Sequence, residues 1–124
     1  MDKALILVYM SAAGIPWSKV RGTKTSVYVS LFSHDYERML FKDPDHMSLY
    51  HLTGNGQVIL SNRISYIFDL KGASMTLDTG CSGGLVALHQ ACQSLRTGEA
   101  EMAIAGGVNL ILSPDGMIPM SMLG

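Results

Sequence analysis

The last third of the chain has the most regular pattern of apolar and polar positions. From residue 82 to residue 96, apolar side chains recur at the spacing of one helix face. The stripe consists of Leu85, Leu88, Cys92 and Leu95. Further small and apolar residues widen it almost all the way round, which is typical of a buried helix. Gly98 is well placed to cap the C-terminus of this helix.

Segments of strand character flank the predicted helix on both sides. Residues 74–77 precede it, and a nearly uninterrupted apolar run over 102–112 follows it. Such a run is typical of a strand that is covered on both faces. The order strand, helix, strand predicts an α/β layered structure.

The earlier part of the chain predicts shorter elements. The pattern indicates a helix over residues 4–13, a strand over 26–32, a short helix over 36–40 and a helix over 57–68. Turn chemistry separates them, as at Gly14-Ile15-Pro16 and Asp43-Pro44-Asp45.

Composition and charge narrow the class of protein. The 124 residues suit one domain, and only 15% are charged, against about 25% in an ordinary domain. A chain this poor in charge fits a piece of a larger body better than a small free-standing domain. The net charge of −1 argues against nucleic acid as a partner. No apolar stretch reaches the length of a membrane span, and we expect a cytoplasmic protein.

The two cysteines lie in very different settings. Eleven residues of one helix separate Cys81 from Cys92 by roughly 16 Å, too far for a disulfide. Cys81 lies where strand 74–77 passes into the helix, and free backbone N–H groups at a helix N-terminus favour a thiolate. The other interpretation is a buried structural thiol, since free cysteine is among the most buried residue types. Cys92, mid-helix on the apolar stripe, is predicted to lie in the core.

The four histidines form no recognisable constellation. We expect His34, His46 and His51 to be solvated in polar loops, and His89 to lie on the buried helix. No pair of histidines or cysteines has the spacing of zinc ligands. Gly54-Asn55-Gly56 lacks the third glycine of a dinucleotide fingerprint. The sequence therefore predicts neither a metal site nor a cofactor-binding site.

Several separate motifs resemble the β-ketoacyl synthases. The segment Asp78-Thr79-Gly80-Cys81-Ser82-Gly83-Gly84-Leu85 is similar to the family's usual Asp-Thr-Ala-Cys-Ser-Ser-Ser-Leu, and residues 62–72, 91–99 and 105–109 continue the match. Residues 43–56 look most like iterative, highly reducing polyketide synthases of fungal type. The resemblance runs from about residue 13 to residue 124, whereas residues 1–12 match poorly.

The resemblance implies a thiolase-like fold, a layered α-β-α-β-α body that is usually a homodimer. Residues 1–124 would be a partial ketosynthase domain, an incomplete N-terminal half. It also implies that Cys81 accepts an acyl group from the phosphopantetheine arm of an acyl carrier protein, while its backbone N–H forms half of an oxyanion hole. A malonyl unit would then lose carbon dioxide and extend the acyl chain by Claisen condensation. Other polyketide synthase domains would be further partners.

This sequence departs from the family pattern in two ways. Gly80 stands where the family usually has alanine, and Gly83 and Gly84 stand where it has serines. The family also needs two histidines from motifs in the second half of the domain, and none of the four histidines lies in such a motif. Two hypotheses follow: an enzyme component that is inactive in isolation, or a truncated remnant that is non-functional or serves as a dimerising interaction module.

Overall fold

The computed structural model describes residues 13–43, 45 and 47–123. Its centre is a three-stranded parallel sheet with the order β2 (Ser74–Leu77), β1 (Thr25–Leu31), β3 (Met102–Val108). Val27 of β1 is in register with Ser74 on one side and Ile104 on the other. The predicted α/β class is confirmed. The helix predicted over residues 4–13 falls almost wholly outside the described residues.

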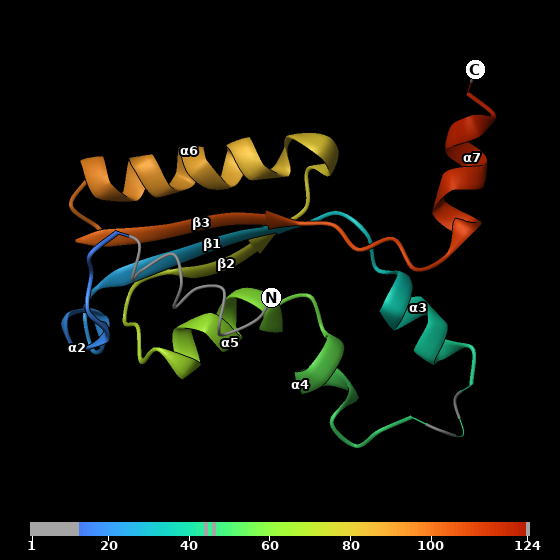
Figure 1. Cartoon of the computed structure of the whole chain (residues 1–124), viewed down its shortest axis with the longest axis horizontal. Helices are drawn as coiled ribbons and strands as arrows, with labels where there is room; N and C mark the ends of the chain where they lie inside the picture. Colours follow the sequence, from blue (N-terminus) through green and yellow to red (C-terminus); the bar gives the residue numbers. More distant parts are fainter. Residues whose placement is uncertain (1–12, 44, 46, 124) are drawn as a thin grey trace.

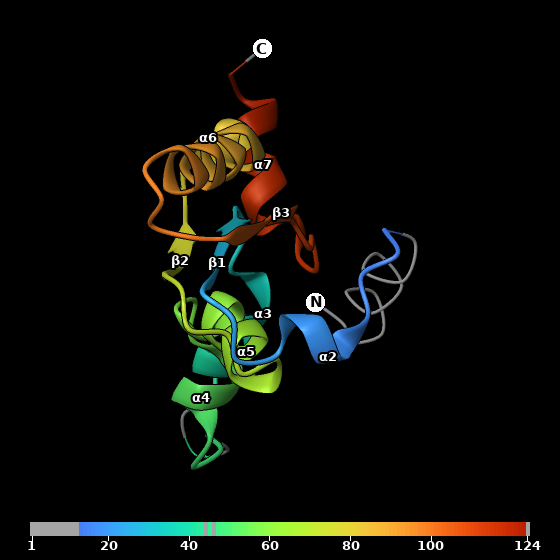
Figure 2. The same cartoon turned by 90° about the vertical axis from the view of Figure 1, so that its left-hand side faces the viewer.

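Helices cover both faces of the sheet. Helix α6 (Gly83–Arg96) lies along one face and α5 (Ile59–Ile67) along the other (Figures 1 and 2). The shorter helices are α2 (Trp17–Val20), α3 (Asp35–Phe41), α4 (His51–Asn55) and α7 (Met117–Ser121). Because β1 is the middle strand and both its faces are covered, its residues from Thr25 to Ser30 are all buried.

The core has one part on each side of the sheet, because successive side chains of a strand point to opposite faces. Val27 and Val29 of β1 point toward α5 and pack with Ile64 and Phe68. Tyr28 points the other way and packs with small residues of α6. Both layers therefore depend on β1.

Helix α6 packs on the sheet through a different face from the predicted one. Its buried residues are Gly83, Ala87, Ala91 and Ser94. The predicted stripe is largely exposed: Leu85 is 74% accessible, Leu88 51% and Leu95 44%. In the 124 residues the predicted burial almost all the way round is not observed: only the face of small side chains is buried, because these residues allow the helix to lie close to the sheet. Cys92 is only half-buried. The predicted cap at Gly98 is confirmed by its φ of +73°.

Strand β3 ends four residues before the predicted boundary. Beyond Val108 the chain leaves the sheet, and polar groups that follow β1 hold it: Ser33 Oγ donates to the carbonyl of Leu110, and Asp35 accepts two backbone N–H groups further along. Nor is β3 covered on both faces, since Ala105 and Gly107 are exposed.

The histidine predictions were also mostly wrong. His51 is buried and its ring lies 4.8 Å from that of Phe41, whereas His89 on α6 is exposed. His34 is largely buried, with 18% of its side chain accessible. His46 lies outside the described residues.

Candidate active site

The candidate nucleophile lies at the carboxyl end of the sheet, where ligand sites of parallel α/β sheets form. Strand β2 ends at Leu77, and a single 3-10 turn, Gly80–Ser82, joins it to α6. Cys81 is the middle residue of this turn. Its thiol is free and the residue is exposed, so the interpretation of Cys81 as a buried structural thiol does not hold for the described structure.

Short polar contacts hold the turn around Cys81. The Gly80 N–H donates to Asp78 Oδ1 over 3.1 Å, and Ser82 Oγ donates to the Thr79 carbonyl over 2.8 Å. Gly80 has a φ of +61°, a conformation that glycine adopts without the steric cost of a side chain. This explains why glycine suits the position where the family usually has alanine.

The start of α6 lies unusually close to the end of β1. A Cβ atom added to Gly83 would lie 1.7 Å from Ser30 Oγ and 2.7 Å from Ser30 Cβ. A Cβ added to Gly84, by contrast, would meet nothing within 4 Å. The serine that the family usually has at position 83 therefore cannot fit here while Ser30 occupies the space.

The N-terminus of α6 has no side-chain cap. The backbone N–H groups of the first turn of a helix have no partner within the helix, and together with the helix dipole they favour an anion at that end. The Cys81 thiol directly precedes this end of the helix, and the thiolate is the form in which a cysteine attacks carbonyl carbons. The turn and helix thus form a setting suited to nucleophilic acyl transfer.

His34 is the residue at this edge that sequence reasoning missed. Its Nε2 lies 3.7 Å from Asp78 Oδ2 and 3.0 Å from the Gln57 amide nitrogen. The available signal was its position shortly after the end of β1, because the carboxyl ends of parallel strands share one edge. In the part of the chain that the structure describes, no three histidine, cysteine or acidic side chains gather as metal ligands do.

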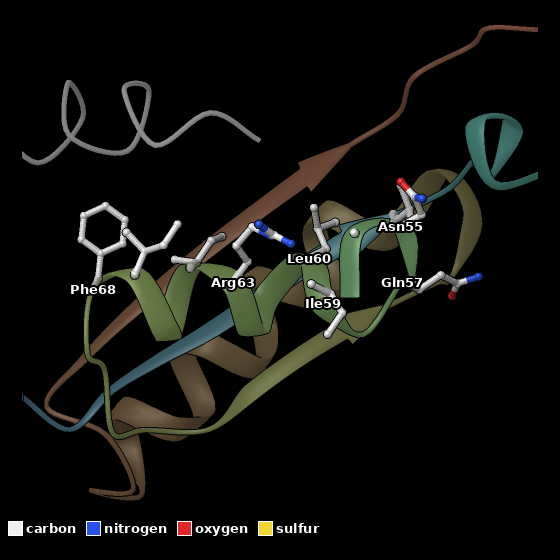
Figure 3. A pocket seen from close by; sticks show the side chains of 11 residues that line it. Asn55, Gln57, Ile59, Leu60, Arg63 and Phe68 are labelled. Atoms are coloured by element: carbon white, nitrogen blue, oxygen red, sulfur yellow. The ribbon is translucent and has the colours of Figure 1, made fainter. Parts of the chain in front are cut away.

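A hollow of about 200 Å³ lies beside α5 and not at Cys81. Figure 3 shows apolar side chains of Ile59, Leu60 and Phe68 around it, with Arg63 among them. The Arg63 guanidinium donates to the Thr53 carbonyl. Cys81 does not line this hollow, and we assign it no part in the chemistry.

The fold and the site share two features: a parallel α/β sheet, and an exposed thiol at its carboxyl edge before a helix without a side-chain cap. A family model described as "Beta-ketoacyl synthase, N-terminal domain" matches residues 7–124. The chain therefore belongs to the β-ketoacyl synthase family. No helix among the described residues is both long and apolar enough to cross a bilayer.

Individual relatives agree with this assignment. The chain is 54% identical over 114 residues to the highly reducing polyketide synthase sdnO of Sordaria araneosa, covering 92% of this chain and 4% of that protein. The module 6 ketosynthase of the Bacillus subtilis bacillaene synthase superposes with a TM-score of 0.76 at 35% identity, over 90% of this chain and 18% of that one. The oxazolomycin ketosynthase domain OzmH KS7 of Streptomyces albus gives 0.78 at 32% identity, over 96% of this chain and 21% of that one.

These relatives confirm the resemblance to fungal highly reducing polyketide synthases and the thiolase-like fold. The chain spans only about 4% of sdnO and about a fifth of the solved ketosynthase chains.

Asp35 is expected to stabilise the fold by anchoring the loop that follows β3. This buried residue heads α3, and its Oδ2 accepts the N–H groups of Leu112 and Ser113 over 3.0 and 3.1 Å. In a ketosynthase domain that carries this segment, Asp35→Ala should lower the free energy of unfolding by about 2 kcal/mol, because two backbone donors lose the charged acceptor that this buried carboxylate provides. Asp35→Asn keeps an acceptor oxygen and should lose less.

Urea unfolding measures this effect, and Asp115→Asn is the matched control. Asp115 is an exposed carboxylate of the same loop, and its pKa is lowered by hydrogen bonding to Ser113 and by the nearby Lys42 ammonium. It should tolerate the change with little loss of stability. Equal effects of Asp35→Ala and Asp115→Asn would contradict the anchoring role.

Proposed function

We propose that this chain is the N-terminal part of a ketosynthase domain of a polyketide synthase, and that Cys81 is its acyl-accepting nucleophile. The observation that carries the proposal is the exposed Cys81 thiol beside the uncapped N-terminus of α6. The family's active-site motif falls on the same residue. An acyl carrier protein is the proposed donor, through its phosphopantetheine arm, and the cytoplasm the proposed location.

The chemistry proceeds in two transfers that leave the cysteine unchanged at the end. The Cys81 thiolate attacks the thioester carbonyl of the acyl carrier, and the backbone N–H of Cys81 donates to the oxyanion that forms. Collapse expels the pantetheine thiolate, which takes up a proton, and leaves an acyl-cysteine. A malonyl thioester then loses carbon dioxide, and its carbanion attacks the acyl-cysteine. The β-ketoacyl thioester is released to the carrier as the Cys81 thiolate leaves.

The family's two histidines for decarboxylation are not matched in these 124 residues. We propose that further sequence of the same synthase supplies them, together with the remaining domains and a second copy of the domain. The catalytic groups act as a unit. For that reason the 124 residues are not expected to catalyse condensation alone.

A chimera tests the assignment of Cys81. Residues 7–124 replace the matching segment of a fungal highly reducing polyketide synthase, and the purified chimera receives an acyl-pantetheine thioester. Peptide mass spectrometry should find the acyl group on Cys81. Cys81→Ala should abolish acylation and lower condensation at least about a thousandfold, whereas Cys92→Ala, on the half-buried second thiol, should preserve both.

Two results would contradict the proposal. Acylation of Cys92 in preference to Cys81 would reverse the assignment. A folded chimera that takes no acyl group at all would favour the inactive remnant.

A further inference from the structure

Asp78 links the turn that carries Cys81 to a neighbouring part of the sheet edge. One carboxylate oxygen, Oδ1, accepts the N–H of Gly80, the residue directly before Cys81. The other oxygen, Oδ2, faces His34 Nε2 at 3.7 Å. Asp78 follows β2 and His34 follows β1, and these strands are adjacent in the sheet. Two strand ends are thus connected through one side chain immediately beside the nucleophile.

His34 is held in place more firmly than an ordinary loop histidine. It precedes Asp35, whose carboxylate is tied to the loop after β3, and its ring is largely buried. The Gln57 amide nitrogen lies 3.0 Å from the same Nε2 atom that faces Asp78. Its Nδ1 atom is buried and has no hydrogen-bond partner among the described residues. Burial and the Gln57 contact thus place the Nε2 edge of the ring toward Asp78.

The charge of His34 decides which neighbour it can bind. A neutral Nε2 accepts a hydrogen bond from the Gln57 amide, whereas a protonated ring forms an ion pair with Asp78. The other charged groups around His34 belong to α3: Asp35, Glu37 and Arg38, which line the adjoining hollows. Of the carboxylates in the described ranges, Asp78 is the one within ion-pair distance of the ring.

We propose that Asp78 and His34 are positioning residues for Cys81. Asp78 fixes the Gly80 N–H and so the 3-10 turn, while His34 fixes the carboxylate of Asp78. The turn in its observed shape holds the exposed thiol immediately before the N-terminus of α6. This role rests on the proposed function of Cys81 as the nucleophile.

The rate of Cys81 alkylation by iodoacetamide is the test, measured from pH 5.5 to 9 in the chimera with Cys92→Ser. Asp78→Ala removes the acceptor for Gly80, and a frayed turn should slow alkylation at pH 7 by about tenfold, because the thiol is no longer held in place before α6. Asp78→Asn keeps an acceptor oxygen and should recover most of that rate. His34→Gln removes the ring that faces Asp78 Oδ2 and should slow alkylation in the same direction as Asp78→Ala, by a smaller factor.

Matched controls are His89→Gln and Glu99→Gln, since both residues are exposed and lie away from the turn. Both should leave the profile unchanged. If Asp78→Ala fails to fold, His34→Gln decides: a profile identical to that of the wild type overturns the inference. A second result would also overturn the inference: the wild-type chimera acylates Cys81, but every Asp78 and His34 variant has the same alkylation profile as the wild type. In that case the proposed function of Cys81 still stands. Failure of the proposed function itself would appear earlier, as a wild-type Cys81 that takes no acyl group.

Discussion

Gly83→Ser is expected to destabilise the protein by about 2–3 kcal/mol or more, because overpacking a buried contact costs energy in this range. The added Cβ would lie 1.7 Å from Ser30 Oγ. Ser30 is buried in the central strand, which has no free side on which to give way. The same helix start carries the Cys81 turn, so the shift should also lower acylation.

A second substitution can restore the space. Ser30→Gly removes the atoms that the new side chain meets, so the double variant Ser30→Gly with Gly83→Ser should recover most of the lost stability. Urea unfolding of the four chimeras measures the coupling between the two sites. Gly84→Ser is the control, because it is the neighbouring glycine-for-serine position and has open space. Equal destabilisation by Gly83→Ser and Gly84→Ser, or no rescue by Ser30→Gly, would refute the steric conflict between Ser30 and a side chain at position 83.

The 124 residues alone are expected to lack a cooperative unfolding transition. The outer face of α6 exposes Leu85, Leu88 and Leu95, and large exposed apolar surfaces are rare on soluble monomers. Among the described residues β2 and β3 each pair on one side only, and open strand edges favour aggregation. The purified chain should therefore be insoluble, or compact without a sharp melting transition.

Calorimetry and sedimentation of the 13.4 kDa chain measure this. Replacing Leu85, Leu88 and Leu95 with glutamine should raise the solubility of the isolated chain. The same three changes should destabilise the chimera, because there we expect the rest of the domain to cover this face. As a control, glutamine at the exposed Leu49 removes an apolar side chain from another surface. A sharp two-state transition from a soluble wild-type monomer would rule out this expectation.

Much of the local structure followed from sequence alone. Strand β2 begins and ends where its pattern predicts, and β1, α5 and α6 agree to within a residue or two. These segments combine strong periodicity with glycine or turn residues at their ends, and such signals depend only on neighbouring residues. The motif around Cys81 likewise indicated the family, and the order of elements indicated that Cys81 would lie at a helix start.

What the sequence could not determine depends on contacts between distant segments. Periodicity located an apolar stripe on α6 but did not show which face of the helix meets the sheet. The small residues Ala87 and Ala91 are the ones buried on that face. Strand β3 ends early because Ser33 and Asp35 hold the chain that follows it. The contact between Ser30 and Gly83, and the pairing of His34 with Asp78, arise only when parallel strands bring their carboxyl ends to one edge. Local patterns decide which elements form, whereas packing decides which side chains meet around the thiol.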